Sequence, residues 1–173
     1  IILIDEAYHP YYKKSYSYLV SNYKNLIIAR TFSKAWGLAG LRLGYAIGDT
    51  EIIRYYHKIK PMYELGSYSI AFIEKMLDHV DQMLASVERI NQGKTFFLNE
   101  MKKLRFDTIN NQGNFLHVAF GKNEERIHNL IEKKVLYRKS FDEICLKNYS
   151  RFTSTTINNF KPIVDLIKTT SNI

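Results

Sequence analysis

The chain has 173 residues, of which 46% are hydrophobic and 24% charged, with one cysteine and a formal net charge of +8 at pH 7. This composition excludes a disordered chain, an internal disulfide and a zinc site built of cysteines alone, and no run of 18 apolar residues is present to cross a membrane. The basic excess contains no block of five or more like charges. We therefore expect a cytoplasmic globular protein with no nucleic-acid partner and no membrane partner.

The sequence opens on an apolar run, Ile1-Ile2-Leu3-Ile4, followed by Asp5 and Glu6. Such a run predicts a buried strand whose carboxyl end presents the two acidic residues. No methionine and no basic leader precede it. We expect a fragment that begins inside a larger protein.

Two further strands and a helix are predicted before residue 61. The β-branched segment 25–31 predicts a strand with both faces buried in a parallel sheet, and segment 41–47 predicts the next strand. Asp49 and Thr50 are typical of a helix cap. They predict a helix over 51–60 that ends at Pro61.

Apolar residues then recur at helical spacing from residue 69 to about residue 104. The spacing predicts one long helical stripe, with a break or bend near Asp78-His79 because the segment exceeds a typical globular helix. A coiled-coil seam would show the same spacing. We favour packing against its own domain, since no complementary charge ladder runs beside the stripe. Its first members are Ile70, Ile73, Leu77, Val80, Leu84 and Val87.

Strands and helices alternate after Phe106, which predicts an α/β or α+β unit. The domain boundary is expected within the long helical stretch, near residue 80. The predicted strands are 114–120, 135–139 and 150–155, and the predicted helices are 124–134 and 159–169.

The most informative segment runs from Arg30 to Gly44, where a strand leads into a loop containing Ser33, Lys34, three glycines and Arg42. A lysine with a lowered pKa can form a Schiff base with a carbonyl group. Glycines let the backbone approach a ligand closely, and an arginine can hold a phosphate. Taken alone, this segment is compatible with any phosphate-binding loop.

The segment becomes specific beside Asp5-Glu6-Ala7-Tyr8, which lies 29 residues before Lys34. Together the two motifs resemble the fold-type I pyridoxal-phosphate-dependent aminotransferases (class I/II), most closely the histidinol-phosphate aminotransferase branch. The resemblance implies an α/β fold that is the C-terminal part of such an enzyme. Residues 1–80 would be the end of the large cofactor-binding domain with a remnant of its mostly parallel sheet. Long helices would connect this part to a small α+β C-terminal domain, residues 81–173.

The resemblance also implies roles for five residues around a pyridoxal 5'-phosphate cofactor. Asp5 would pair with the pyridine nitrogen and keep it protonated, and Tyr8 would donate to the phenolic oxygen of the ring. Lys34 would hold the cofactor as a Schiff base and move the proton at the substrate. Ser33 and Arg42 would bind the cofactor phosphate.

Two later arginines are implied at the substrate. Arg151 matches the family arginine that binds the α-carboxylate, and Arg138 matches one that reaches a substrate phosphate in the histidinol-phosphate branch. The residues after Arg151, Phe-Thr-Ser-Thr, depart from the family's usual pattern. The implied partners are an amino acid and a 2-oxo acid, with a homodimer in the full-length protein. The five histidines show no metal-ligand spacing, so no metal is expected.

The family's amino-terminal half is missing from this sequence, so we expect weak cofactor binding and little turnover by the chain alone. Three functions remain open. The first is an aminotransferase, and the second is a decarboxylase or lyase acting on an amino-acid phosphate on the same scaffold. The third is a non-catalytic fragment. The first two use Lys34 in the same way, so the sequence does not divide them.

Overall fold

The structure is a computed structural model that describes residues 1–171. The chain forms two compact units, Ile1–Val87 (unit 1) and Glu88–Ile173 (unit 2), and each is described by itself. The division falls inside a long helix, and the expected division into domains near residue 80 stays a prediction. Among the helices of residues 1–171, none is long and apolar enough to cross a membrane.

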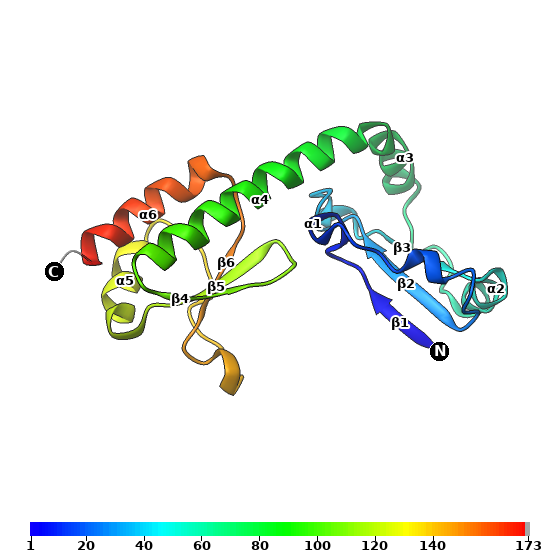
Figure 1. The fold of residues 1–173 in the computed structure, drawn as a ribbon. Coiled ribbons are helices and arrows are strands. Elements are labelled where there is room, and N and C mark those ends of the chain that lie inside the picture. Colours follow the sequence, from blue (N-terminus) through cyan, green and yellow to red (C-terminus); the bar gives the residue numbers. More distant parts are fainter. Residues whose placement is uncertain (172–173) are drawn as a thin grey trace. The chain divides into compact units, whose positions relative to one another are not determined.

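Unit 1 contains a three-stranded sheet in the order β1-β2-β3 (Figure 1), formed by β1 (Ile2–Asp5), β2 (Leu26–Thr31) and β3 (Gly44–Gly48). β1 and β2 are parallel, as predicted, whereas β2 and β3 are antiparallel. The predicted third strand over 41–47 starts too early. Residues 39–41 form a 3₁₀ turn, and Arg42 takes a left-handed conformation at φ 55°, which no strand accommodates.

The prediction of a buried first strand is wrong for this chain. β1 lies at the edge of the sheet, and Ile1, Ile2 and Leu3 are 89%, 54% and 64% exposed. Strand formation needs only the β-branched sequence and one partner, β2. Burial needs further elements on both faces of the strand, and within the described residues these do not cover β1.

The helices of unit 1 begin with a short one, α1 (His9–Tyr12), in the β1–β2 connection. α2 (Thr50–Ile59) follows β3 directly. The Asp49 side chain accepts a hydrogen bond from the Glu51 amide at 2.9 Å, so the predicted cap is present. Pro61 follows just beyond the end of α2, as predicted.

The long helical segment is divided where the sequence indicated. α3 (Ser67–Met76) and α4 (Val80–Lys103) are separated by a 3₁₀ turn over Leu77–His79. Only part of the predicted stripe packs against its own unit, because Ile73 and Val87 are buried while the members between them stay exposed. These exposed members are Leu77, Val80 and Leu84.

Unit 2 is a two-layer α+β unit with an antiparallel sheet in the order β4-β5-β6. β5 (Phe115–Ala119) and β6 (Ser150–Thr153) were predicted, whereas β4 (Asp107–Asn110) was not. The predicted strand 135–139 is instead a single bridge between Arg138 and Arg151. Helix α5 (Glu124–Ile131) is shorter than expected, and α6 (Ile157–Ser171) is longer.

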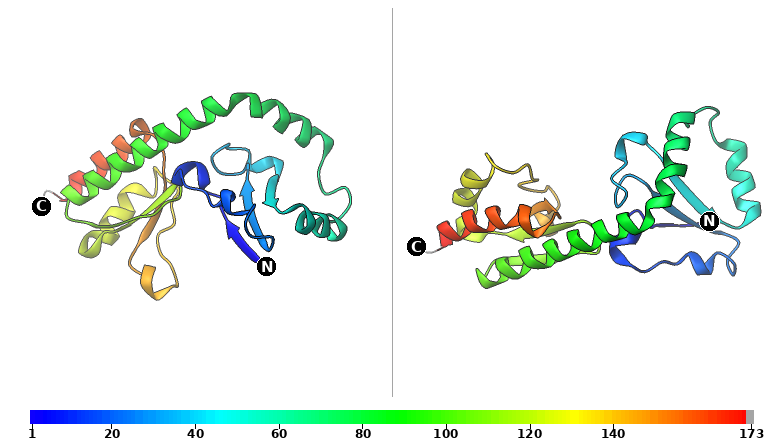
Figure 2. Two further views of the ribbon diagram at one scale, coloured as in Figure 1. Left: turned by 45° about the vertical axis from the view of Figure 1, so that its right-hand side comes forward. Right: turned by 90° about the horizontal axis from the view of Figure 1, so that it is seen from above.

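The core of unit 2 lies between one face of this sheet and helices α4, α5 and α6. Leu116, Val118 and Phe152 supply the sheet face, and each is at most 1% exposed. α4 and α6 run side by side (Figure 2), joined where Lys168 pairs with Glu100 at 2.6 Å. Gly93 allows this packing, because a Cβ there would lie 1.9 Å from the Thr155 carbonyl oxygen.

Candidate functional site

The parallel pair β1–β2 brings the two chemical motifs to one edge of the unit 1 sheet. Asp5 is the last residue of β1 and pairs with Ala29 of β2, so the carboxyl ends of both strands coincide. The Asp5 carboxylate accepts a hydrogen bond from the Ala7 amide at 2.8 Å and is exposed. Within residues 1–171 no cation forms an ion pair with it. Asp5 therefore presents an available carboxylate at this edge.

Tyr8 and Lys34 meet at the same edge. The Lys34 ammonium lies 5.5 Å from the centre of the Tyr8 ring. Tyr8 is placed by the turn after β1, where the His9 amide donates to the Glu6 carbonyl at 2.9 Å. Lys34 is exposed, and no carboxylate in the described part of the chain pairs with it. The predicted lysine and tyrosine are thus neighbours in the structure.

Backbone hydrogen bonds close the loop that carries Lys34. The Phe32 amide donates to the Leu43 carbonyl, and the Phe32 carbonyl accepts from the Leu38 amide, each at 3.1 Å. Phe32 and Leu43 are buried together with Ile73 of α3. These contacts hold both ends of the loop close to the sheet and to α3.

Ser33 and Arg42 lie next to this closure, one after Phe32 and the other before Leu43. The Ser33 amide donates to the Thr31 hydroxyl at 3.0 Å. Arg42 is exposed, and its guanidinium donates to the Ala39 carbonyl at 3.2 Å. The closure places the predicted phosphate-binding pair at the same end of the loop as Lys34.

Gly44 explains how the backbone closes at this point. A Cβ at Gly44 would lie 2.6 Å from the Arg30 carbonyl oxygen, a distance that side chains do not tolerate. Gly37, at φ 68°, supplies the left-handed turn within the loop. Two of the glycines in the motif thus have structural reasons for being there.

A buried ion pair that sequence reasoning missed lies just behind the site. The Arg30 guanidinium is 2.9 Å from the Glu6 carboxylate, whose side chain is 5% exposed. Burial alone would raise the pKa of Glu6, but hydrogen bonds from the Tyr16 amide, Arg30 and Ser15 hold this pKa below its usual value. The sequence does contain a signal for this pair. Arg30 is a charged residue in an otherwise apolar strand, and Glu6 occupies the matching position after the preceding strand.

Unit 2 brings the two predicted substrate arginines together. The Arg138 amide donates to the Arg151 carbonyl at 3.1 Å, and the Arg151 amide donates to the Arg138 carbonyl at 2.8 Å. Side chains of directly opposed residues share one face of a sheet. Both side chains are exposed. The arginines therefore form a pair on the face opposite the core.

Aromatic rings support both guanidinium groups. Arg138 lies 4.0 Å from the centre of the Phe141 ring, and Arg151 lies 5.5 Å from that of Phe115. His117 pairs with Arg151 across the sheet. Burial and the charge of Arg151 lower the pKa of His117, so its neutral form is favoured. In the described residues its Nδ1 has no hydrogen-bond partner.

A second buried cation, also missed from the sequence, shapes the turn before β5. The Lys94 ammonium donates to the carbonyl oxygens of Asn111 and Gly113. Burial lowers the pKa of Lys94. A lysine in a helix that is otherwise amphipathic gave no specific signal. Lys94 fixes the turn that leads into Asn114 and Phe115.

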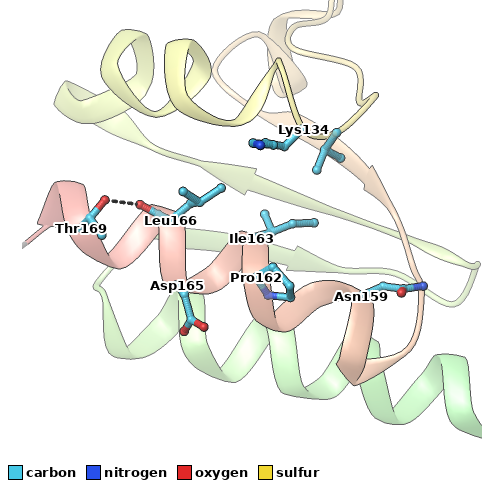
Figure 3. Close-up of a pocket in the computed structure, with 8 residues that line it drawn as sticks. Lys134, Asn159, Pro162, Ile163, Asp165, Leu166 and Thr169 are labelled. Atoms are coloured by element: carbon cyan, nitrogen blue, oxygen red, sulfur yellow. Dashed lines mark hydrogen bonds between the residues drawn. The ribbon is translucent and has the colours of Figure 1, made fainter.

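A surface groove of unit 2 lies away from these arginines. It has a volume of about 600 Å³ and is lined mainly by α6, with Lys134 facing that helix (Figure 3). None of the predicted site residues lines it. Across residues 1–171 no group of three histidine, cysteine, aspartate or glutamate side chains is placed to hold a metal ion.

A lysine amine beside a tyrosine ring, at the sheet edge where Asp5 ends its strand, can form a Schiff base with a carbonyl compound. Residues 1–167 match the family described as aminotransferase class I and II. The chain belongs to this family. The match confirms the resemblance that the two motifs indicated.

Individual relatives agree with this assignment. A histidinol-phosphate aminotransferase from Clostridium novyi is 30% identical over 169 residues, which are 97% of this chain and 47% of that protein. The structure of the Sinorhizobium meliloti histidinol-phosphate aminotransferase, in complex with pyridoxal-5'-phosphate, superposes with a TM-score of 0.82 at 20% identity. It matches 99% of this chain and 48% of that one.

A neighbour with another activity shares the fold. L-threonine-O-3-phosphate decarboxylase from Porphyromonas gingivalis matches with a TM-score of 0.80 at 17% identity, over 96% of this chain and 54% of that one. These likenesses confirm the predicted fold class. The chain spans about half the length of the curated relatives it matches.

Proposed function

We propose that this chain is the C-terminal half of a pyridoxal-phosphate-dependent aminotransferase, which moves an amino group from an amino acid to a 2-oxo acid. The observation that carries the proposal is the contact between Lys34 and Tyr8 at the strand end that presents Asp5. Family membership over residues 1–167 supports it. The assignment of residues 1–80 and 81–173 to a large and a small domain belongs to the same proposal.

The residues of unit 1 fit the cofactor by their chemistry. The cofactor aldehyde reacts with an amine. Lys34 offers one, and no carboxylate among the described residues forms an ion pair with it. A protonated ring nitrogen needs an acid, and Asp5 is exposed and unpaired with any cation in residues 1–171. A phosphate needs a hydroxyl and a cation, which Ser33 and Arg42 offer, each next in sequence to the Phe32–Leu43 backbone bond. When bound, the cofactor supplies a ring that accepts electron density from the α-carbon of the substrate.

Lys34 and Asp5 perform different tasks in this proposal. The Lys34 amine removes the proton from the substrate α-carbon as a general base and returns it as a general acid. Asp5 holds a proton on the ring nitrogen, because a carboxylate stabilises the protonated form of a neighbouring base. The Tyr8 hydroxyl donates to the phenolic oxygen and orients the ring.

Arg151 and Arg138 bind the anionic groups of the substrate. A guanidinium binds a carboxylate or a phosphate through two parallel hydrogen bonds. The rings of Phe115 and Phe141 restrict how the two guanidiniums turn, so less conformational entropy is lost on binding. We assign the α-carboxylate to Arg151 and a substrate phosphate to Arg138. The names of the histidinol-phosphate relatives support the second assignment.

Assembly and location are part of the proposal. The matched relatives are about twice as long, so the remaining cofactor contacts would come from residues outside this chain. We propose a cytoplasmic homodimer for the complete protein. We also propose weak cofactor binding by the 173-residue chain alone.

A second candidate function is decarboxylation of an amino-acid phosphate. The Porphyromonas gingivalis neighbour supports it, since that decarboxylase shares the fold at a TM-score of 0.80. The same lysine and arginine pair would serve this reaction. A non-catalytic role for the chain is the third possibility, and the experiment below separates all three.

The experiment follows the cofactor after a single turnover. The protein encoded by the complete reading frame that contains this chain is loaded with pyridoxal phosphate and mixed with an amino acid, without a 2-oxo acid. The aminotransferase proposal predicts stoichiometric pyridoxamine phosphate and no carbon dioxide. Carbon dioxide with unchanged cofactor would establish the decarboxylase instead. Neither product, with Lys34→Ala behaving like the parent, would establish a non-catalytic role.

A further inference from the structure

The carboxylate of Glu6 is the most extensively bonded acid of unit 1. Its Oε2 accepts from the Arg30 Nε and from the Ser15 hydroxyl, each at 3.0 Å. Its Oε1 accepts from the Tyr16 amide at 2.6 Å. Arg30 in turn donates to the Ser15 hydroxyl at 2.7 Å. With both oxygens engaged and 5% of the side chain exposed, Glu6 is not placed to touch a substrate.

The position of this ion pair links it to the site. Asp5 and Ala29 are the last pair of the β1–β2 ladder, and Glu6 and Arg30 are the next residues of the two strands. The Glu6 amide also donates to the Ala29 carbonyl at 2.8 Å. Glu6 thus lies between Asp5 and Tyr8 in sequence, and Arg30 lies four residues before Lys34. The pair thus joins the two strands at the ends that are followed by Tyr8 and by Lys34.

Contacts continue from Arg30 into the lysine loop. The Arg30 guanidinium donates to the Tyr45 hydroxyl at 3.4 Å. The Tyr45 ring packs on Phe32 with their centres 5.4 Å apart, and Phe32 packs on Trp36 at 5.9 Å. Phe32 and Trp36 flank Lys34 in sequence. The ion pair is therefore connected to both sides of the Lys34–Tyr8 contact.

We propose that Glu6 and Arg30 form a positioning pair that holds Asp5 and Tyr8 in register with Lys34. The inference rests on the proposed function, because it concerns the reactivity of Lys34 toward the cofactor aldehyde. Besides the backbone bond from Glu6 to Ala29, the pair joins the two strand ends by side-chain hydrogen bonds just beyond Asp5.

Stability alone is a weak reason for such a pair. Desolvation offsets much of the attraction between buried charges, and well-packed apolar residues often stabilise a fold as well. A charge pair adds directional hydrogen bonds, which fix the relative position of the elements that they join. Removing one partner leaves a buried charge alone, whereas removing both leaves none. This difference separates stability from positioning in an experiment.

The test measures how selectively pyridoxal phosphate reacts with Lys34. The protein encoded by the complete reading frame that contains this chain is incubated with the cofactor and reduced with borohydride. The fraction of adduct on Lys34 relative to exposed Lys24 is then read by peptide mass spectrometry. Glu6→Gln is compared with Glu64→Gln, which removes the charge from the surface pair Lys60–Glu64 in the same unit. Circular dichroism and urea unfolding select a temperature at which each variant is folded.

We expect Glu6→Gln to lower the Lys34 selectivity about tenfold, because a small misplacement of reacting groups costs a large factor in rate. Glu64→Gln should leave the selectivity at the parental value. The double variant Glu6→Gln/Arg30→Met should regain stability, since no unpaired charge remains, yet keep the low selectivity. Selectivity that returns with stability would overturn the positioning role.

Two controls cover the cases in which Glu6→Gln does not fold or the parent shows no selectivity. If Glu6→Gln does not fold, Ser15→Ala removes one hydrogen bond to each partner and should give a smaller loss of selectivity in a folded chain. Parental selectivity in folded Ser15→Ala would then overturn the inference. If the complete parent protein shows no preference for Lys34 over Lys24, the proposed function fails rather than the inference about Glu6.

Discussion

The two units differ in what they bury. Unit 2 packs α4, α5 and α6 onto one face of its sheet around fully buried aromatic residues such as Phe97, Phe152 and Phe160. In unit 1 the hydrophobic cluster at the lysine loop is built on Phe32, Leu43 and Ile73, while β1 lies exposed at the sheet edge. Unit 2 is therefore stabilised by apolar burial, and the site edge of unit 1 by hydrogen bonds and ion pairs.

The arginine pair of unit 2 and the lysine site of unit 1 are therefore held in place by different interactions. Arg138 and Arg151 extend from the outer face of a well-packed sheet, so their backbone positions depend on a hydrophobic core. Lys34, Tyr8 and Asp5 depend on a loop closure and on the Glu6–Arg30 pair. Substitutions should therefore separate chemistry from stability more cleanly in unit 2 than in unit 1.

The largest effect is expected for Lys34→Ala in the complete protein. Without the amine, proton transfer at the substrate loses its acid and base, and kcat should fall by roughly 10³-fold or more. Lys24→Ala, which removes an exposed lysine before β2, should leave kcat unchanged. Steady-state amino transfer measures both, and equal rates for the two variants would contradict the role of Lys34.

A core substitution should distinguish the two units by stability. Phe97→Ala in unit 2 should lower the free energy of unfolding by about 3–5 kcal/mol, because it leaves a cavity in a fully buried cluster. Phe72→Ala in unit 1 should cost much less, since that side chain is already partly exposed. Urea denaturation measures both changes. Similar losses would show that the units are equally well packed.

Arg151→Lys should raise KM for the amino acid by about 10- to 100-fold and change kcat little, because a lysine cannot form the two parallel hydrogen bonds of a guanidinium. The folded state should be preserved, as the side chain is exposed.

Arg138→Lys should raise KM only for substrates that carry a phosphate. The ratio of KM values for matched substrates with and without phosphate checks this assignment. An unchanged ratio in Arg138→Lys would contradict it.

The smallest effect concerns the acid stability of unit 1. The pKa of Glu6 in the folded chain lies below its ordinary value of 4.5, so the unfolded state binds the proton more readily. Its contribution to stability is complete above pH 4.5 and is lost as the pH falls through the folded-state pKa. Glu6→Gln should reduce the slope of unfolding free energy against pH in this acid range. An unchanged slope would contradict the lowered pKa.

The sequence predicted which residues lie together at the sheet edge better than it predicted their surroundings, and the roles of these residues stay predictions. Asp5, Tyr8 and Lys34 follow from two motifs at a fixed separation, because strand ends deliver residues to one edge of a parallel sheet. Arg138 and Arg151 were expected separately, and their pairing across a bridge was not. The Glu6–Arg30 pair and Lys94 were missed, since a buried charge is recognised only once its partner is located in space.

Errors in the fold have a common physical origin. The start of β3 was misplaced because local propensity does not show that Arg42 takes a left-handed conformation. β4 was missed, since a four-residue strand with mixed exposure carries little periodic signal. The burial of β1 and of the stripe through Leu77 and Leu84 was overestimated. Sequence periodicity shows that a face is apolar, but it does not show which residues cover that face.

The central claim is that Lys34 is the residue that binds the cofactor aldehyde. Its most direct test is borohydride reduction, in the presence of pyridoxal phosphate, of the protein encoded by the complete reading frame that contains this chain, followed by peptide mapping of the adduct. We predict that Lys34 carries most of the adduct at a low molar excess of cofactor, and that Lys34→Ala loses the adduct without shifting it to another site. An adduct spread evenly over the exposed lysines, and unaffected by Lys34→Ala, would contradict the claim.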